Sequence, residues 1–293
     1  MSKAVLVVGA GPAGLSAAVA LKQAGIPTRI IDRLSAPTNQ SRAAIVHARS
    51  LEHFERLGFV DDFLTAGVKV RGAAIYGPGN LLLIRPSLED LPTPFPFMLG
   101  LEQFETERLL TTRLTQAGIA VERGAELVDF RDSAEHVAVR LRHAEGREET
   151  AEFAYVLGCD GARSTVRSVL GLHLEGETLD AIWITADVKI REPDEAIAFL
   201  SPDGIAFIAP MNDDRWRVIV NLPTTTKTEA EKLTLDDIQA LVRDRFEADV
   251  RSMIRSGSAP LGSIRDWLPP CARDGFFSQA MPRTCIAPSV DRA

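Results

Sequence analysis

The chain has 293 residues and a net charge of −7, and 45% of its residues are hydrophobic and 25% are charged. This length suits two domains or one large α/β unit. The acidic balance argues against nucleic-acid partners, and no apolar run reaches the ~20 residues of a membrane-spanning helix. The three cysteines, Cys159, Cys271 and Cys285, lack the spacing of a metal site or a disulfide framework, so we expect no metal and a cytoplasmic protein.

The chain opens with the pattern of a strand, a glycine turn, a helix and a second strand. The apolar run at residues 5–8 leads into the sequence GAGPAG at 9–14, and apolar residues then continue at helical spacing to Leu21. A second apolar run at 28–31 ends on Asp32. This order and spacing are typical of dinucleotide-binding proteins.

Each part of this motif has a physical role in holding a dinucleotide. Gly9 permits a tight turn, Gly11 lets the backbone approach a pyrophosphate, and Gly14 lets the helix pack closely on the strand. The first N–H groups of the helix and its dipole face the phosphates. Asp32 can accept hydrogen bonds from ribose hydroxyls, which favours an unphosphorylated ribose. The motif alone does not choose between NAD and FAD.

The middle of the chain alternates predicted helices and strands. Apolar periodicity predicts helices over 43–57, 60–64 and 103–117, with Gly58 and Gly118 after the first and third. Strands are predicted over 70–76, 81–84, 120–122, 125–132, 136–142 and 149–157. The proline-rich run at 91–97 is predicted to be a loop.

The last of these strands runs straight into the sequence GCDGARSTVR at residues 158–167. Asp160, at the end of an apolar strand, can accept hydrogen bonds from ribityl or ribose hydroxyls. The alternative is a turn that Asp160 merely caps.

Four landmarks in this order resemble the class A flavoprotein monooxygenases, the family of para-hydroxybenzoate hydroxylase, phenol hydroxylase and the polyketide aromatic hydroxylases. The landmarks are GAGPAG with Asp32, Ser41-Arg42-Ala43 before a helix, Gln103 followed by ETERLL at 105–110, and GCDGARSTVR. The resemblance covers residues 1 to about 250. It implies an α/β fold with an FAD-binding, Rossmann-like parallel sheet of the glutathione-reductase type and an antiparallel β-sheet substrate domain of α+β type.

The same resemblance assigns the cofactor site. The glycine turn and the acid hold the AMP half of FAD, Arg42 and Gln103 touch the flavin side, and Asp160 lies near the pyrophosphate. The family acid is usually Glu, so Asp32 is one methylene shorter. The cofactor-binding residues expected are Gly9, Gly11, Pro12, Ala13, Gly14, Asp32, Arg33, Arg42, Gln103, Asp160 and Gly161.

The resemblance also divides the chain into domains. It places the FAD-binding domain at 1–75 and 98–180, the substrate domain at 76–97 and 181–250, and a poorly ordered tail at 251–293. Strands predicted over 181–190, 196–200, 204–210 and 216–222 form the sheet that roofs the substrate cavity in the family, followed by a helix over 233–246. Five apolar residues are candidates to line that cavity, with plain core as the commoner role: Ile182, Ile184, Phe199, Phe207 and Ile208.

The activity implied is hydroxylation of a small aromatic or phenolic substrate. In the family NADH or NADPH reduces FAD, and O2 then adds to give a flavin hydroperoxide. No catalytic side chain is assigned, since His47 and His53 are expected on an exposed helix, and a homodimer is left open. The alternatives are a non-catalytic FAD- or nucleotide-binding remnant, or another FAD enzyme such as an epoxidase, a halogenase or a reductase.

The family's third FAD motif, GDAAH, is missing from the place where the resemblance expects it. Residues 276–288 show no GD pair, no helical pattern and little strand character. In a shifted reading frame, however, the degenerate codons of residues 276–287 permit Leu-Leu-Ala-Gly-Asp-Ala-Ala-His, although only one Ala of this motif is forced. The hypothesis is a frameshift near residue 252 that inactivates the product, and the alternative is a natural divergent tail.

Overall fold

The computed structural model describes residues 4–38, 43–133, 135–173, 182–189, 195–212, 215–222 and 284–286, with five single residues between 234 and 244. These residues form two compact units, each made of separate chain segments. The first holds residues 4–38, 104–133, 135–173 and 284–286, and the second holds 43–103, 182–189, 195–212 and 215–222. Most of the helix predicted over 233–246 and most of the tail after 251 lie outside the described residues.

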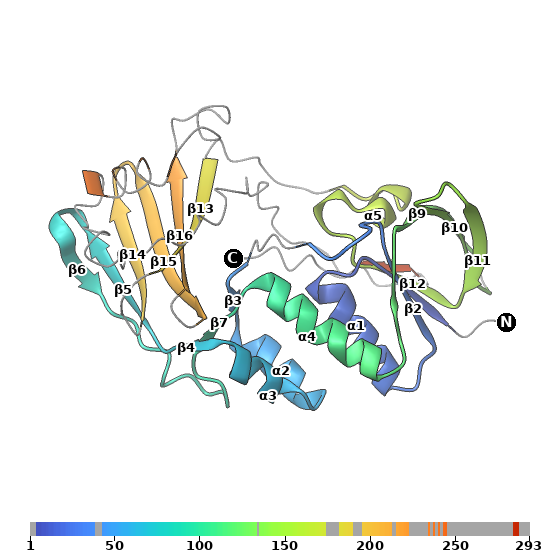
Figure 1. The fold of residues 1–293 in the computed structure, drawn as a ribbon, viewed down its shortest axis with the longest axis horizontal. Coiled ribbons are helices and arrows are strands. Elements are labelled where there is room, and N and C mark those ends of the chain that lie inside the picture. The colour runs from blue at the N-terminus through green and yellow to red at the C-terminus, as the bar shows by residue number, and fades with distance from the viewer. Residues whose placement is uncertain are drawn as a thin grey trace. The chain divides into compact units, whose positions relative to one another are not determined.

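The first unit is built on a parallel sheet with the strand order β17-β12-β1-β2-β8 (Figure 1). Its strands are β1 (Val5–Val8), β2 (Thr28–Asp32), β8 (Val121–Arg123), β12 (Tyr155–Gly158) and β17 (Thr284–Ile286). Because every pairing is parallel, the carboxyl ends of these strands share one edge of the sheet. All residues of β1 are buried, as the apolar run predicts for a central parallel strand.

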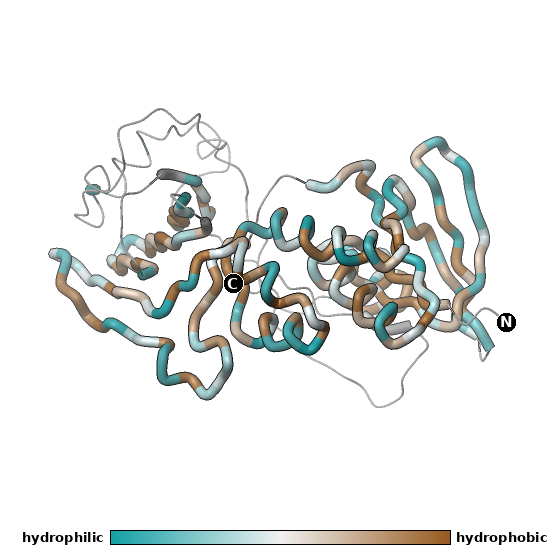
Figure 2. Tube along the Cα trace, turned by 60° about the horizontal axis from the view of Figure 1, so that its bottom comes forward, coloured by the Kyte–Doolittle hydropathy of each residue, from teal (hydrophilic) through white to brown (hydrophobic). Residues whose placement is uncertain are grey.

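Helices connect these strands. α1 (Pro12–Gln23) joins β1 to β2, and α4 (Gln103–Gln116) precedes β8. A short 3₁₀ turn, η2 (Gly161–Arg163), and α5 (Thr165–Val169) follow β12. Hydrophobic and hydrophilic residues alternate along the helices, so each presents one face to a core (Figure 2).

A three-stranded antiparallel sheet completes the first unit, with the order β11-β10-β9. Its strands are β9 (Ala125–Asp132), β10 (Val137–His143) and β11 (Glu148–Phe153). Alternate residues such as Leu127, Val139 and Leu141 are buried and join one core with Leu6 and Val156 of the parallel sheet.

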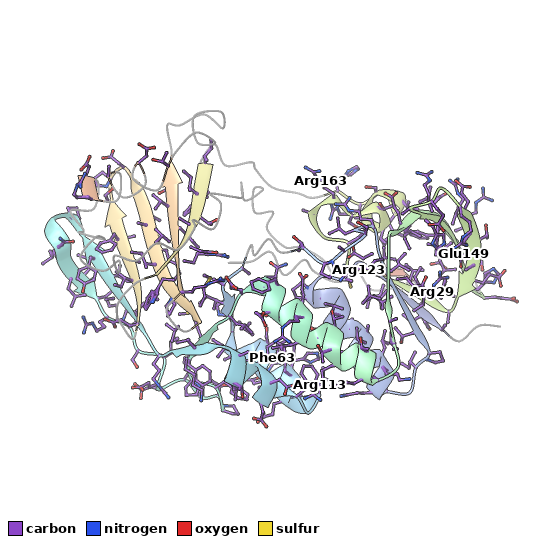
Figure 3. The ribbon with its side chains drawn as sticks, viewed as in Figure 1. Arg29, Phe63, Arg113, Arg123, Glu149 and Arg163 are labelled. Atoms are coloured by element: carbon purple, nitrogen blue, oxygen red, sulfur yellow. The ribbon has the colours of Figure 1, made fainter. Side chains whose placement is uncertain are left out.

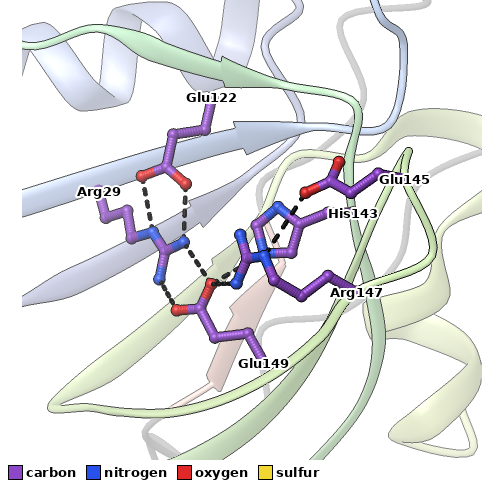
Figure 4. Close-up of polar contacts among 6 residues, drawn as sticks. All are labelled: Arg29, Glu122, His143, Glu145, Arg147 and Glu149. Carbon is purple, nitrogen blue, oxygen red and sulfur yellow. Dashed lines mark hydrogen bonds and ion pairs between the residues drawn. The ribbon is translucent and has the colours of Figure 1, made fainter.

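A cluster of charged side chains ties the two sheets together (Figure 4). The Arg29 guanidinium donates two hydrogen bonds of 2.7 Å to Glu122, and two more of 2.6 and 3.1 Å to Glu149. Glu149 also contacts His143 Nε2 at 2.8 Å and Arg147 at 3.7 Å. The hydrogen bonds from Arg29, and then from His143, lower the pKa of Glu149 to about 2.

The second unit is built on a six-stranded sheet with the order β13-β16-β15-β14-β5-β6. Its strands are β5 (Ala73–Gly77), β6 (Leu81–Ile84), β13 (Ile182–Lys189), β14 (Ala196–Ser201), β15 (Gly204–Asn212) and β16 (Arg215–Leu222). The β14–β5 pairing is parallel and the others are antiparallel. The turn η1 (Pro78–Asn80) closes the β5–β6 hairpin.

A smaller sheet and two helices pack in the same unit. β3 (Ile45–Val46), β7 (Met98–Gly100) and β4 (Val68–Val70) form an antiparallel sheet. Ile45, Val70 and Met98 pack against Ala196 and Ala209 of the larger sheet. The helices α2 (Ala48–Arg56) and α3 (Val60–Ala66) meet through stacked phenylalanine rings.

These contacts explain why the unit boundaries differ from the predicted domain boundaries. The predicted FAD-binding domain includes residues 43–75 and 98–103, but these residues form β3, β4, β7 and the two helices of the second unit. Their apolar side chains are buried against β14 and β15. The compact units therefore divide the chain near residues 39 and 103, while the domain boundaries at 75 and 98 stay predictions.

The strand register separates the five residues predicted to line a substrate cavity. Phe199 pairs with Ala206, Ile197 with Ile208, and Ile184 with Val220, so Ile184, Phe199 and Ile208 share one face of the sheet. Phe207 pairs with Ala198 and lies on the opposite face. The five residues therefore cannot line one cavity together.

Four local predictions are wrong. The helix predicted over 43–57 begins only at Ala48, because the β-branched pair at 45–46 joins β7 as a strand. The strand predicted over 70–76 is divided, because β4 ends at Val70 and β5 begins at Ala73; a Cβ on Gly72, between them, would lie 2.8 Å from the Pro86 carbonyl oxygen. The strand predicted over 149–157 is divided at Ala154, since β11 pairs with β10 and β12 pairs with β1. Residues 284–286, predicted to have little strand character, pair with β12 as β17.

Candidate functional site: a dinucleotide cradle

The glycine turn after β1 is fixed by close backbone contacts on two sides. Gly9 adopts a φ of +101°, and a Cβ there would lie 2.3 Å from the Cys159 carbonyl oxygen. A Cβ on Gly14 would lie 1.9 Å from the Gly9 carbonyl oxygen. Both glycines are therefore required for the turn to close against α1 and β12.

Gly11 differs from these two glycines because no described residue fills the space beside it. It is the N-cap of α1, and a Cβ there would meet no atom within 4 Å. Pro12 and Ala13 begin the helix, where the first N–H groups have no partner within the helix. The structure thus leaves open space at the one glycine where the sequence predicts that a pyrophosphate approaches.

Asp32 holds the glycine turn in place. Its Oδ2 accepts a hydrogen bond of 2.7 Å from the Ala10 N–H, and its Oδ1 accepts one of 2.8 Å from the Leu34 N–H. Each carboxylate oxygen has a second lone pair, so ribose hydroxyls still have acceptors. The side chain of Asp32 is only 13% exposed, and Arg123 Nη1 lies 3.7 Å from its Oδ2.

Asp160 uses one oxygen for the fold and leaves the other without a partner. Its Oδ2 accepts hydrogen bonds from the N–H groups of Thr165 at 2.6 Å and Val166 at 3.2 Å. Its Oδ1 is buried and has no hydrogen-bond partner among the described residues. Gly161 follows with a φ of +73°. The turn-capping role and a ligand-binding role are therefore compatible, one for each oxygen.

The segment after Asp160 is held by its own side chains. Ser164 is the N-cap of α5 and accepts a hydrogen bond of 2.9 Å from the Arg167 N–H. The Arg167 guanidinium donates to the carbonyl oxygens of Gly161 and Ala162. Cys159 is not a candidate nucleophile, because burial raises the pKa of its thiol to about 12.

The remaining predicted site residues lie elsewhere. Arg33 follows β2 and is exposed. Gln103 begins α4 in the second unit, where its N–H donates to the Ala43 carbonyl oxygen at 3.1 Å. Arg42 lies outside the described residues. His47 and His53 are exposed, as expected.

Two participants were missed by the sequence analysis. The Ala10 N–H is bound by Asp32, and Arg123 is placed opposite Asp32 by the register of β2 and β8. A signal for Arg123 was available, since it follows the predicted strand at 120–122 and the carboxyl ends of parallel strands form ligand sites.

The second unit contains a separate cluster of charges. Glu102 is 2% exposed and both of its oxygens contact a single donor, Arg215 Nη1, at 3.1 and 3.3 Å. Burial raises the pKa of Glu102, and the nearby Arg215 only partly offsets this. Beside it, the buried Arg217 forms two hydrogen bonds of 2.7 and 2.9 Å to Asp187.

We call the glycine turn at 9–14, Asp32 and Asp160 together the cradle. The cradle in the first unit fits an adenine dinucleotide. Open space at Gly11, the start of α1, the Asp32 carboxylate and the unpartnered Asp160 oxygen all belong to the carboxyl edge of one parallel sheet. Within the described residues, no helix is long and apolar enough to cross a membrane, and no group of three His, Cys, Asp or Glu could hold a metal.

Comparison with known proteins identifies the family. A family model described as an FAD binding domain matches residues 2–256. The chain belongs to the class A flavoprotein monooxygenases. FAD is accordingly the dinucleotide of this family, and the predicted α/β fold with a parallel sheet and antiparallel sheets is confirmed.

The relatives of this chain are named as monooxygenases and hydroxylases. The chain is 35% identical over 222 residues to the 6-methylpretetramide 4-monooxygenase of Streptomyces rimosus, covering 73% of this chain and 39% of the relative. It is 32% identical over 227 residues to the pentachlorophenol 4-monooxygenase of Sphingobium chlorophenolicum, covering 74% and 42%. The solved structure of the anhydrotetracycline hydroxylase OxyS from Streptomyces rimosus matches with a TM-score of 0.65 and 29% identity, covering 85% and 50%. The chain therefore spans half or less of the length of each of these relatives.

Proposed function

We propose that this chain binds FAD and acts in the NADH- or NADPH-dependent hydroxylation of a small phenolic or other electron-rich aromatic substrate. The observation that carries the proposal is the contrast among the three glycines of the turn. Gly9 and Gly14 are packed against backbone, and only Gly11 faces open space. The names of the relatives, which include a pentachlorophenol 4-monooxygenase and an anhydrotetracycline hydroxylase, support the aromatic substrate class.

The residues of the cradle divide the work of holding FAD. Gly11 and the first N–H groups of α1 bind the pyrophosphate, where the helix dipole favours negative charge. Asp32 fixes the turn through Ala10 and accepts ribose hydroxyls. The free Oδ1 of Asp160 accepts a hydroxyl hydrogen bond, while its Oδ2 keeps α5 in position. The bound flavin supplies the redox chemistry between the nicotinamide, O2 and the ring, and the protein supplies binding, orientation and exclusion of water.

The first test separates the role of Gly11 from the fold. Gly11→Val should leave the protein folded, because the new side chain meets no atom within 4 Å of its Cβ, yet it should abolish FAD binding by occupying the pyrophosphate's approach. Ala24→Val, at the exposed far end of the same helix, is the matched control. Fluorescence titration with FAD and circular dichroism measure both properties. A folded Gly11→Val protein with wild-type FAD affinity would contradict the proposal.

The second test distinguishes the proposed reaction from its alternatives. Purified protein is loaded with FAD, and NADH and NADPH oxidation is followed with and without phenols, together with product and H2O2. Phenol-dependent oxidation with hydroxylated product supports a monooxygenase. FAD binding without turnover supports a non-catalytic remnant, and turnover without hydroxylation supports another FAD enzyme such as an epoxidase, a halogenase or a reductase. The cytoplasmic location and the homodimer remain predictions.

We also propose that the sequence after about residue 252 is read in a shifted frame and that this lowers hydroxylation. The family match ends at residue 256, which supports the proposal. The test is to express this chain beside a version with the frame restored near Met253, and to compare coupled hydroxylation with H2O2 release. Hydroxylation by this chain at a rate near that of the restored version would show that the tail is functional and the frameshift hypothesis wrong.

A further inference from the structure

Arg123 lies at the carboxyl edge of the parallel sheet, where the cradle is formed. It is the last residue of β8 and pairs in register with Asp32, the last residue of β2. Figure 3 shows it in the first unit together with Arg29. Because the two strands are parallel, Arg123 is at the same end of the sheet as the glycine turn.

The Arg123 guanidinium is enclosed but poorly partnered. Its side chain is 16% exposed, and its one ion pair among the described residues is the 3.7 Å contact from Nη1 to Asp32 Oδ2. This distance is too long for a hydrogen bond. Among the described residues no acceptor takes a hydrogen bond from the five N–H donors of this guanidinium.

Asp32 does not complete the pairing, because each of its oxygens is held by a short backbone hydrogen bond and the guanidinium stays 3.7 Å from Oδ2. Oδ2 takes the Ala10 N–H at 2.7 Å and Oδ1 takes the Leu34 N–H at 2.8 Å. The guanidinium therefore neutralises Asp32 from a distance and keeps its own donors available. An enclosed cation with unfilled donors is unfavourable unless acceptors from a ligand or water meet it.

The position of the Arg123 N–H donors indicates which half of the dinucleotide they can contact. Asp32 bonds to Ala10 in the glycine turn, so Arg123 stands beside the residue that the dinucleotide motif assigns to the adenosine ribose. The adenosine half of a dinucleotide carries ribose, ring and phosphate acceptors. The isoalloxazine half is assigned elsewhere.

We propose that Arg123 is a positioning residue of the cofactor site that fixes the Asp32 carboxylate and donates hydrogen bonds to the adenosine half of FAD. This inference rests on the proposed function and adds to it a residue that selects one half of the cofactor. If the inference holds, the affinity for any ligand with an adenosine diphosphate group depends on Arg123. The affinity for the flavin half alone does not.

The test compares three ligands on four proteins. Arg123→Met, Arg123→Lys and the wild type are titrated with FAD, ADP and riboflavin, and the unfolding temperature of each ligand-free protein is measured. Arg140→Met is the matched control, because Arg140 also has a long ion pair, 3.8 Å to Glu148, but is 47% exposed and lies in β10. Arg123→Met should weaken FAD and ADP by about ten- to a hundredfold and leave riboflavin unchanged, as expected for lost hydrogen bonds from a charged donor.

Arg123→Lys should recover part of the loss, since a lysine keeps the charge but not the planar set of donors. Arg140→Met should bind all three ligands like the wild type. FAD and ADP affinities of Arg123→Met within twofold of the wild type would overturn the inference, as would an equal loss for riboflavin. If Arg123→Met does not fold, the same comparison is decided with Arg123→Lys.

The outcomes also separate this inference from the proposed function. Wild-type protein that binds ADP but not FAD would overturn the proposed FAD-dependent function. The ADP affinities of the wild type and Arg123→Met would still test the role of Arg123. Wild-type protein that binds FAD, with an Arg123→Met variant that binds it equally well, would overturn only the inference.

Discussion

Two arginines lie on the same pair of strands, β2 and β8, and their surroundings differ sharply. Arg29 of β2 makes four hydrogen bonds of 2.6–3.1 Å with Glu122 and Glu149. Arg123 of β8 has a single ion pair of 3.7 Å with Asp32. Both side chains are largely enclosed, at 22% and 16% exposed. Arg29 uses four of its five N–H donors on side chains of the fold, so it is a structural residue. Among the described residues, Arg123 keeps its donors unused beside the cradle, so it is available to a ligand.

The largest effect on stability should come from Arg29→Met. The change leaves Glu122, which is 40% exposed, and Glu149, which is 23% exposed, without their shared cation, and the loss of this partly exposed network costs about 2–3 kcal/mol of unfolding free energy. FAD affinity should stay at the wild-type level, because no part of the cradle contacts Arg29 through the bonds described. Urea unfolding and FAD titration measure the two effects. Arg140→Met, which breaks an exposed pair, should cost no more than about 0.5 kcal/mol.

A smaller effect should appear on acidification, through Glu149. Its pKa is lowered from the usual 4.5 to about 2 in the folded protein, so the unfolded chain binds its proton first as pH falls. The stabilisation is complete above pH 4.5 and is lost as pH falls from 4.5 towards 2. Allowing for solvent screening, it amounts to about 1–2 kcal/mol. Unfolding free energies between pH 6 and 3 should therefore fall more steeply for the wild type than for Glu149→Gln. Parallel curves for the two proteins would contradict the assignment.

The smallest effect on stability should come from Glu102. Like Arg123, it is an enclosed charged side chain with a single ion-pair partner among the described residues. Both of its oxygens depend on one donor nitrogen of Arg215, and burial raises its pKa. The folded protein therefore holds this proton more tightly than the unfolded chain, and stability falls as pH rises from 4.5 through the raised pKa. Glu102→Gln should remove this dependence, a change of about 1 kcal/mol or less between pH 5 and 8. Thermal unfolding across that range checks it, and an unchanged slope in the variant would show that Glu102 is fully compensated.

The comparison also shows which features the sequence could predict. The cradle is local: β1, the glycine turn, α1 and β2 lie within residues 5–32, and apolar runs with glycines at fixed spacing identify them. Asp160 was predicted as a strand-end acid, and the structure adds that its two oxygens have different roles. Both clusters around Arg29 and Arg123 were missed, because they depend on the register of strands about 90 residues apart in the chain.

The errors have the same origin. Ile45 and Val46 fit a helical pattern, but they form a strand because they pair with β7. Phe207 and Ile208 are neighbours in sequence, and only the pairing with β14 shows that they face opposite sides. The unit boundary near residue 39 follows from packing on β14 and β15, which are about 150 residues further along the chain. Periodicity reports one element at a time and carries no information on its partner.

The central position of β1 has a consequence for how the protein is made. β1 pairs with β12, and Val8 meets Gly158, 150 positions later, while the Cys159 N–H donates to the Val8 carbonyl oxygen at 2.7 Å. The turn at Gly9 is closed by that same late segment. A ribosome must therefore deliver more than half of the chain before the first fourteen residues acquire their final shape. β2 is available early to pair with one edge of β1, but the other edge of β1 and the closure of the Gly9 turn wait for β12, so the complete cradle forms late in synthesis.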